Sequence, residues 1–387
     1  MILNSEKISN TIVAFYLSTI LIIGMIANNT IITAIFYFAF FIAVIFTFVT
    51  SRRLRLGVFI ISAGGFLCGI LGICVNGNSQ ILNLLYMVFS IYVAIILANP
   101  KVNYNIFYYS AIITALIIIV KIARNGINSS IFPESSVNYI SVFLMLSICL
   151  YYARADLYEK EYSLVPALIS FALTIIAGGR GGFLALSVLV IPLILIKFFS
   201  KKRSGIEKVL LAFFLLFVVV VVGYPLILRI VNNTDIILVN NFQNKASLTN
   251  SYRYYCWLEY LERCRNTWKE LLFGVKISTL KWANILNGNL HNSYLTIHAY
   301  YGIFGVLFVI IQTVRTMLFL LKAKKWVYLF SLLSFEIRAF TDHLFAANRM
   351  SPIFLAMLLA PSLVNYYCCS NSKTVGCVQQ YSIKLIQ

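Results

Sequence analysis

The chain is divided into long apolar runs separated by short polar connections. A helix that spans a membrane needs about 20 apolar residues, and twelve runs approach that length. They cover residues 11–27, 31–50, 56–75, 81–98, 106–122, 137–153, 163–178, 182–199, 209–230, 291–320, 326–340 and 351–366. The pattern predicts an all-α polytopic membrane protein with about twelve transmembrane helices, forming one domain over residues 1–387. The first run has no clear small-residue cleavage site, so we expect it to be kept as a signal anchor.

Composition excludes the soluble classes of protein. Of the 387 residues, 61% are hydrophobic and 11% are charged, whereas soluble domains have ~45–50% and ~25%. Lys and Arg number 31 against 12 Asp and Glu, and most of them fall in alternate connections, near Arg52, Lys101, Arg154, Lys201 and Lys322. This is the positive-inside pattern of cytoplasmic loops. We therefore expect a cytoplasmic N-terminus, and the positive charge requires no nucleic-acid partner.

Cysteine and histidine spacing indicates neither a disulfide framework nor a metal site. Of the eight cysteines, only Cys256 and Cys264 share the outer segment, and residues eight apart on one helix are too distant for a disulfide. His291 and His298 are seven apart, whereas a helical metal pair is typically four apart. We expect no metal and no cofactor.

One connection, residues 231–290, is much longer than the others and lies on the predicted outer side. Within it, five residues recur at helical spacing: Trp257, Leu261, Cys264, Trp268 and Leu271. This stripe predicts one amphipathic helix that ends near Gly274. Two compatible interpretations follow, a segment packed on the bundle and a lid over a site at the membrane surface.

A glycine-rich turn between two of the runs is the first candidate site. Gly179 and Gly181 flank Arg180 on the predicted outer side. Glycines let the backbone approach a ligand and expose amide donors, and a guanidinium can bind a phosphate with two parallel hydrogen bonds. The alternative is a tight turn with an Arg that extends to the membrane surface.

Three more polar positions fall on the same side of the membrane. Arg253 begins the amphipathic helix, His291 opens an apolar run together with Asn292 and Tyr294, and Asp342 lies between the last two runs. A histidine can accept a proton at neutral pH, and a helix start favours an anion. The alternatives are a solvated charge, a structural histidine and a local ion-pair network.

These elements occur in the order found in one known family. The glycine-rich Arg turn precedes Arg-x-x-x-Trp at Arg253, Leu-Phe-Gly ending at Gly274, and His-Asn-Ser-Tyr-Leu at 291–295 with Gly302 and Gly305 downstream. Here the chain resembles the O-antigen ligase/polymerase superfamily of bacterial envelopes. The resemblance covers roughly residues 165–315, and the remainder matches only in hydropathy and in the number of spans.

The resemblance implies a GT-C-like, metal-independent glycosyltransferase of the bacterial inner membrane, with its site facing the periplasm. Arg180 and Arg253 would hold a diphosphate, His291 would act at the acceptor hydroxyl, and Gly179, Gly181, Asn292, Tyr294 and Asp342 would bind substrate. The implied partners are undecaprenyl-diphosphate-linked glycan donor and acceptor and membrane lipid. A chain-length regulator protein is a further candidate partner.

Three functions are compatible with these residues. A polymerase joins lipid-linked repeat units, and we favour it because the chain is short, rich in Phe, Tyr, Ile and Asn, and atypical in its first half. A ligase would move the finished polymer onto lipid A–core. A lipid-linked sugar flippase or transporter is the third, although its polar residues should lie near the midplane of the bilayer.

Overall fold

The computed structural model describes residues 5–199 and 252–370. Within those ranges, residues 24, 26–28, 51, 78–80, 128–130, 133–137, 178–179, 287 and 346–349 are not described. The described residues form helices and contain no strand. The predicted run 209–230, the first part of the outer connection (231–251) and Gly179 lie outside the described residues.

The elements follow the predicted runs closely. In chain order they are α1 (Ser5–Leu17), the π-helical η1 (Ser18–Ile23), α3 (Asn29–Thr50), α4 (Arg52–Asn76), α5 (Ile81–Leu97), α6 (Tyr104–Asn125), α7 (Tyr139–Leu157), α8 (Val165–Ala177), α9 (Arg180–Phe199), α13 (Tyr252–Asn266), α14 (Trp268–Phe273), the 3₁₀ turn η4 (Ile277–Thr279), α15 (Lys281–Ile285), α16 (Ser293–Lys322), α17 (Trp326–Thr341) and α18 (Ser351–Ser370). Each predicted run except 209–230 coincides with a helix, the first with α1 and η1 together.

Four of the described helices are long and apolar enough to cross a membrane. They contain the segments Tyr104–Asn125, Tyr139–Leu157, Gly181–Phe198 and Ser293–Lys322, and the other described apolar helices or apolar segments are shorter. The protein is therefore helical and carries features of a membrane-embedded chain, whereas the number twelve stays a prediction.

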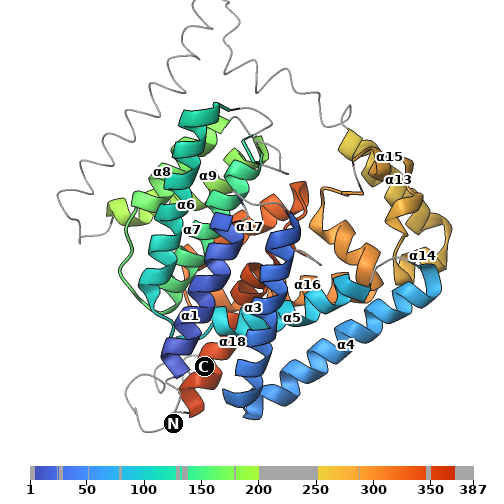
Figure 1. Ribbon diagram of the computed structural model, residues 1–387, viewed down its shortest axis with the longest axis horizontal. Coiled ribbons are helices and arrows are strands. Elements are labelled where there is room, and N and C mark those ends of the chain that lie inside the picture. The colour runs from blue at the N-terminus through green and yellow to red at the C-terminus, as the bar shows by residue number, and fades with distance from the viewer. Residues whose placement is uncertain are drawn as a thin grey trace, which may run out of the picture.

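One group of helices packs around α7 (Figure 1). The spanning segment of α7 is 94% buried, against 28% for α6, and α7 packs on α6, α8, α9 and α17. A helix that is apolar on all sides is stable where other helices surround it. The outer helices instead expose large apolar side chains, including Phe38, Leu116, Ile191 and Ile311. Such a surface is typical of helices that face lipid.

The predicted inner connections lie together at one end of the bundle. The guanidinium of Arg154 donates to the carbonyl oxygens of Leu97 (2.5 Å) and Asn99 (3.0 Å). Lys325 Nζ lies 2.9 Å from a carboxylate oxygen of Glu159. Segments that the charge pattern assigns to one side of the membrane are thus in contact with one another.

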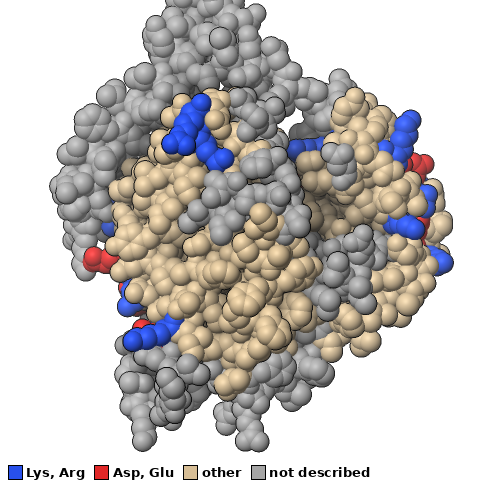
Figure 2. Space-filling model, in the orientation of Figure 1, with Lys and Arg blue, Asp and Glu red and all other residues tan. Residues whose placement is uncertain are grey.

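The predicted outer connections meet at the opposite end. Arg338 at the end of α17 donates to the carbonyl oxygen of Asn138 (3.2 Å) before α7, and Gly181 of α9 lies against Arg338. Figure 2 shows the described charged side chains at the edges of the bundle and over α13 to α15, with uncharged residues across most of the described surface between them. The fold therefore has the two polar ends that the alternation of charge predicts.

Residues 252–290, called the lid below, comprise α13, α14, η4 and α15 and form a small core of their own. The prediction of one continuous helix to Gly274 is wrong, because α13 ends at Asn266 and Thr267 is extended (φ −140°, ψ 124°) before α14 begins. The helix buries Cys256, Tyr260 and Cys264. Two residues of the predicted stripe are instead exposed, Leu261 at 53% and Trp268 at 78%.

The lid is fastened to α4 and α16. Asn76 Nδ2 at the end of α4 donates to the carbonyl oxygen of Gly274 (2.7 Å). His298 of α16 is buried with Nδ1 2.8 Å from the Tyr260 hydroxyl and Nε2 2.8 Å from the Leu271 carbonyl oxygen. At Gly302 (φ +64°) α16 kinks, and a Cβ there would lie 2.1 Å from the Leu272 carbonyl oxygen. Glycine thus permits α14 to pack directly on the backbone of α16.

Candidate functional site

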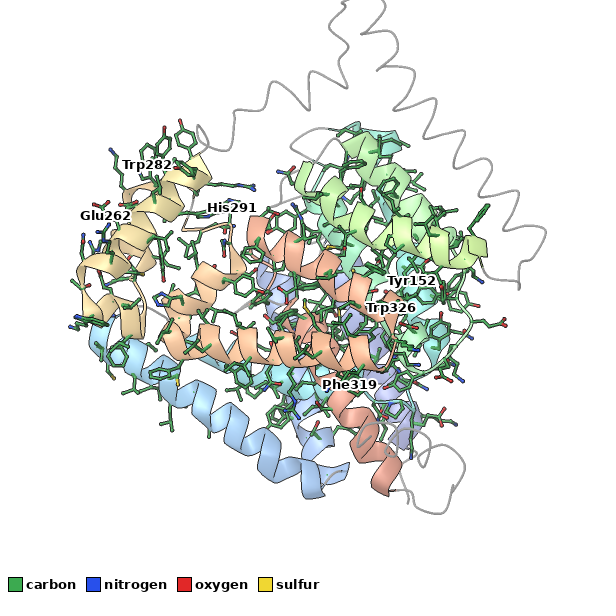
Figure 3. The ribbon with its side chains drawn as sticks, turned by 180° about the vertical axis from the view of Figure 1, so that it is seen from behind. Tyr152, Glu262, Trp282, His291, Phe319 and Trp326 are labelled. Atoms are coloured by element: carbon green, nitrogen blue, oxygen red, sulfur yellow. The ribbon has the colours of Figure 1, made fainter. Side chains whose placement is uncertain are left out.

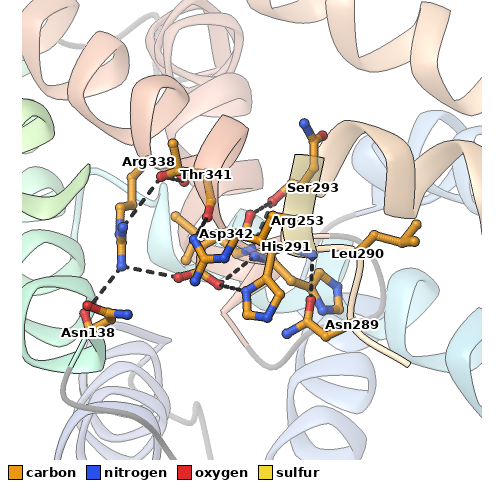
Figure 4. Close-up of polar contacts among 12 residues, drawn as sticks. Asn138, Arg253, Asn289, Leu290, His291, Ser293, Arg338, Thr341 and Asp342 are labelled. Atoms are coloured by element: carbon orange, nitrogen blue, oxygen red, sulfur yellow. Dashed lines mark hydrogen bonds and ion pairs between the residues drawn. The ribbon is translucent and has the colours of Figure 1, made fainter. Parts of the chain in front are cut away.

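Four charged or titratable side chains from three parts of the chain meet at the outer end. Arg253 from the lid, His291 before α16, and Arg338 and Asp342 at the end of α17 form what we call the outer polar cluster (Figure 4). Asp342 is its centre, with Oδ1 3.4 Å from His291 Nδ1 and Oδ2 3.1 Å from Arg338 Nη2. Arg253 Nη1 donates to the carbonyl oxygen of Thr341 at 2.9 Å.

The start of α16 fixes the position of His291. The residue has a positive φ of 47°, and its backbone N–H donates to Asn289 Oδ1 at 2.7 Å. Asn292 then caps α16, because its Oδ1 accepts from the N–H groups of Tyr294 and Leu295. The imidazole is thus held just before the first turn of the helix, so His291 does not share a helical face with His298.

Asn292 and Tyr294, predicted as substrate-binding residues, also have protein partners. Asn292 Nδ2 donates to the Phe340 carbonyl oxygen at 3.2 Å. The Tyr294 hydroxyl donates to the carboxylate of Glu336 on α17, and the other oxygen of Glu336 accepts from Thr313 at 3.0 Å. Both residues therefore lie close to the cluster and join the first turn of α16 to α17.

The Asp342 carboxylate is held ionised inside the protein. Asp342 is only 1% exposed. Burial by itself raises the pKa of Asp342, but His291 and the guanidiniums of Arg338 and Arg253 outweigh burial and lower the pKa to about 2. The backbone on either side is fixed as well, since Ser293 Oγ donates to the Asp342 carbonyl oxygen and accepts from the N–H of Leu344, both at 2.8 Å.

His291 combines a buried and an accessible side. Nδ1 is buried and makes no hydrogen bond within the described part of the chain, and its 3.4 Å separation from Asp342 is long for one. The side chain as a whole is 19% exposed. A carboxylate beside one ring nitrogen orients the imidazole and stabilises its protonated form, which leaves the other nitrogen to accept a proton.

The glycine-rich turn reaches the same cluster. A Cβ at Gly181 would lie 2.8 Å from Arg338 Nη1 and 3.1 Å from Thr341 Oγ1. The role that the structure shows for Gly181 is thus close packing of α9 on α17, which differs from the predicted approach to a ligand. Arg180 is the first residue of α9, but its side chain and Gly179 lie outside the described residues.

Arg338 is the cluster residue that the sequence did not single out as a site residue. It is 3% exposed and lies four residues before Asp342, the spacing at which helical side chains form ion pairs. Its Nε is buried without a hydrogen-bond partner among the described residues. A buried guanidinium with spare donor capacity is costly unless it is paired, so Arg338 both holds Asp342 and adds positive charge.

Neither a scan against protein-family models nor a search of curated proteins found a match for this chain. The resemblance to the O-antigen ligase/polymerase superfamily therefore rests on its motifs, and the function must be argued from the geometry of the cluster.

An apolar cavity of about 280 Å³ lies beside α16. It lies between α4, α5 and α16 and is lined by Gly64, Gly65, Cys68, Met87, Val88, Ile91, Ile297, Tyr301, Phe304, Gly305, Phe308 and Val309. Its α16 side begins at Ile297, about one helical turn after the start of that helix. In the described residues no group of three or more His, Cys, Asp and Glu could hold a metal ion.

Proposed function

We propose that this protein is an O-antigen polymerase, a glycosyltransferase that joins undecaprenyl-diphosphate-linked oligosaccharide repeat units at the periplasmic face of the bacterial inner membrane. The observation that carries the proposal is the convergence of Arg253, His291 and Asp342 in one cluster at the outer end of a helical membrane protein. Arg253 and His291 are 38 positions apart in the chain, and His291 and Asp342 are 51 positions apart. The fold brings them together.

The cluster matches the charges of the proposed reaction. The acceptor hydroxyl oxygen forms a bond to the anomeric carbon of the donor sugar, and the bond from that carbon to the diphosphate oxygen breaks. The diphosphate leaves with the electron pair, so negative charge grows where Arg253 and the Arg180 end of α9 would bind it. The proton of the acceptor hydroxyl passes to His291, whose imidazolium the Asp342 carboxylate stabilises. A single displacement of this kind inverts the anomeric configuration.

The apolar cavity beside α16 supports the same proposal. An undecaprenyl tail must lie in an apolar site while its diphosphate lies at the polar end. The cavity follows α16 from Ile297 to Val309, and α16 begins two residues after His291. We propose that part of the tail occupies this cavity.

The position of the cluster also bears on the alternatives. A flippase or transporter should place its polar site near the midplane, whereas this cluster lies at helix ends, at the start of α16 and the end of α17. A ligase would use the same chemistry on a different acceptor, so the geometry does not separate ligase from polymerase and an experiment must.

The test is a set of alanine variants expressed in a strain that lacks the native gene. His291→Ala and Arg253→Ala should abolish long-chain surface polysaccharide on a lipopolysaccharide gel, and Arg180→Ala should do the same. Arg265→Ala is the matched control, because Arg265 lies on the same lid helix in an exposed position. All variants should insert into the membrane in equal amounts.

The gel also separates the two transfer reactions. Core carrying a single repeat unit in the deletion strain indicates a polymerase, and bare core with accumulated lipid-linked polymer indicates a ligase. Normal ladders from His291→Ala and Arg253→Ala would overturn the site.

A further inference from the structure

Three aromatic side chains form a continuous group on the surface of the lid. Tyr252 and Tyr255 of α13 both lie against Trp282 of α15, with ring centroids 5.7 Å and 5.1 Å apart and interplanar angles of 31° and 25°. Tyr252 is 58% exposed and Tyr255 is 39% exposed. We call these three residues the aromatic platform. The lid core does not include the two tyrosines, because it is formed around Cys256, Tyr260 and their neighbours.

A carboxylate holds the two helices of the platform together. The two oxygens of Glu259 accept from the backbone N–H groups of Lys281 (2.8 Å) and Trp282 (3.0 Å). These contacts fix the first residues of α15 against α13, so the indole is positioned next to the tyrosines. Tyr252 and Tyr255 are three residues apart and therefore lie on one face of α13. A preformed aromatic surface loses little side-chain entropy when a ligand binds.

The platform and the outer polar cluster are joined through α13, of which they use different faces. Arg253 directly follows Tyr252 but points about 100° away from it around the helix, and its guanidinium reaches Thr341. One turn later, Trp257 Nε1 donates to the carbonyl oxygen of Leu290, the neighbour of His291, at 2.7 Å. In Figure 3, Trp282 lies at the outer tip of the lid and His291 lies between the lid and the bundle, both at the same end of the molecule. A long substrate that reaches His291 can therefore extend over the platform.

The surroundings of the platform favour an aqueous, hydroxyl-rich ligand over lipid. Lys281 Nζ lies 5.5 Å from the centroid of the Trp282 ring, and the carboxylate of Glu259 accepts from the backbone N–H of Trp282. Two charged groups would be costly within hydrocarbon, and α13 continues with the exposed charges Glu262 and Arg263. Sugar rings fit both features, because their C–H faces carry partial positive charge that the negative aromatic face attracts, while their hydroxyls can bond to Lys281 and Glu259.

We infer that the aromatic platform is a glycan-binding subsite that holds the sugar rings of the polysaccharide beside the transfer site. This inference rests on the proposed function, since it assigns the platform to a substrate of that reaction. The platform does not take part in bond making. Its effect is to retain a glycan of several sugars, so a short glycan that ends at His291 does not depend on it.

The experiment uses the full-length protein in lipid nanodiscs and measures binding by calorimetry. The probes are oligosaccharides of one and of several repeat units, released from the surface polysaccharide of the strain that carries the gene. Trp282→Ala and Tyr255→Ala should weaken binding of the longer probe by about tenfold or more and shorten the polysaccharide made in cells. Trp268→Phe is the matched control, because Trp268 is 78% exposed on the lid but lies outside the platform, and it should bind as the wild type does.

Two further measurements separate the possible failures. His291→Ala should bind the longer probe normally but transfer nothing. If it transfers, the proposed function fails. If it is inactive while Trp282→Ala and Tyr255→Ala bind the longer probe as tightly as the wild type, the platform alone is refuted. Nanodiscs that contain brominated lipid test whether lipid occupies the platform instead. The fluorescence of Trp282 is obtained as the difference between the wild type and Trp282→Phe. Quenching of this fluorescence would place the platform in the membrane and overturn the subsite.

Discussion

At the scale of single residues, Asp342 controls the outer polar cluster. It is the buried carboxylate that Arg338, His291 and Arg253 all face. Its ionisation costs desolvation energy, which the surrounding positive charges more than offset. The cluster is therefore stable only while the carboxylate is charged, and Arg338, which is buried too, depends on the same charge.

Replacement of Asp342 should change how stability depends on pH. Because the folded pKa of about 2 lies below the ordinary value near 3.9, ionised Asp342 contributes about 2.5 kcal/mol at pH values well above 4, and that contribution is lost as the pH falls towards 2. Asp342→Asn leaves Arg338 unpaired and should cost about 3–5 kcal/mol at neutral pH. Thermal unfolding in detergent should show the two proteins converging as the pH drops below about 4.

The control for that experiment is Glu262→Gln, since Glu262 is an exposed carboxylate on α13. Its unfolding temperature should follow that of the wild type at every pH. A difference between Asp342→Asn and wild type that stays constant down to the lowest pH would show that the charge of Asp342 does not stabilise the fold.

At the scale of helices, the lid and α16 behave as one unit because their backbones touch. Gly302 allows this contact, and its φ of +64° together with the nearby Leu272 carbonyl excludes a side chain. Gly126 at the end of α6 is a natural comparison, because it has nearly the same φ, +67°, with open space around it. A comparison of substitutions at Gly302 and Gly126 therefore distinguishes the effect of backbone strain from the effect of lost packing.

Alanine at each of these two glycines should give different results. Both substitutions impose about 1–3 kcal/mol of backbone strain, because each glycine combines a positive φ with an extended ψ (−166° at Gly302 and −175° at Gly126). Only Gly302→Ala also places a Cβ 2.1 Å from another backbone. Gly302→Ala should therefore release α14 from α16 and expose the lid. Limited trypsin digestion, followed at Arg263, Arg265 and Lys269 on the lid, should be faster for Gly302→Ala than for Gly126→Ala. Equal digestion rates would contradict the packing argument.

The cavity between α4, α5 and α16 can be tested in the same way. Gly65 lines it and has no atom within 4 Å of an added Cβ, so Gly65→Leu fills the cavity without a clash at Cβ. The apparent affinity for the undecaprenyl-linked donor should fall by about tenfold or more, whereas a donor with a short lipid should be affected less. Leu71→Phe is the control, since Leu71 is 50% exposed on the same helix and does not line the cavity.

The sequence predicted the existence of the helices far better than the details of the lid. Apolar runs are long and their ends are charged, so hydropathy located α3 to α9 and α16 to α18. The break in the lid helix was missed because the apolar spacing continues through it. Thr267 and Glu270 have the spacing of a capping box, and their side chains are hydrogen-bonded at 2.8 Å. That signal could have located the start of α14.

The sequence singles out most residues of the outer polar cluster, but it does not predict their contacts. Arg253, His291 and Asp342 drew attention because charged and titratable residues are rare in this chain. The i, i+4 spacing of Arg338 and Asp342 is visible in the sequence, but the contact of Asp342 with His291 is not, since that depends on how α16 and α17 pack. Asn292 has contacts that the motif alone did not reveal, because its side chain caps α16 and bonds to α17. Its role in substrate binding stays a prediction.

At the scale of the whole molecule, the protein has two polar ends and an apolar belt. Inner and outer connections each gather at their own end, as the charge pattern requires if the N-terminus is cytoplasmic. The orientation itself follows only from the distribution of Lys and Arg, so it calls for a direct measurement.

Alkaline phosphatase fusions should establish the orientation in cells. A fusion after Gly126, beyond the end of α6, should be active because the enzyme folds only on the periplasmic side. A fusion after Lys160, beyond the end of α7, should be inactive. The reversed pattern would place the outer polar cluster in the cytoplasm and exclude the proposed reaction with periplasmic substrates.

The unequal attachment of the lid determines where a substrate can reach the cluster. The lid is fixed to α4 and α16 by buried side chains and direct backbone packing, whereas Arg253 joins it to α17 through a hydrogen bond to Thr341. The less secured boundary therefore runs directly over His291 and Asp342. A bulky lipid-linked glycan would therefore approach His291 and Asp342 from the α17 side of the lid, because the α16 side is closed by direct packing.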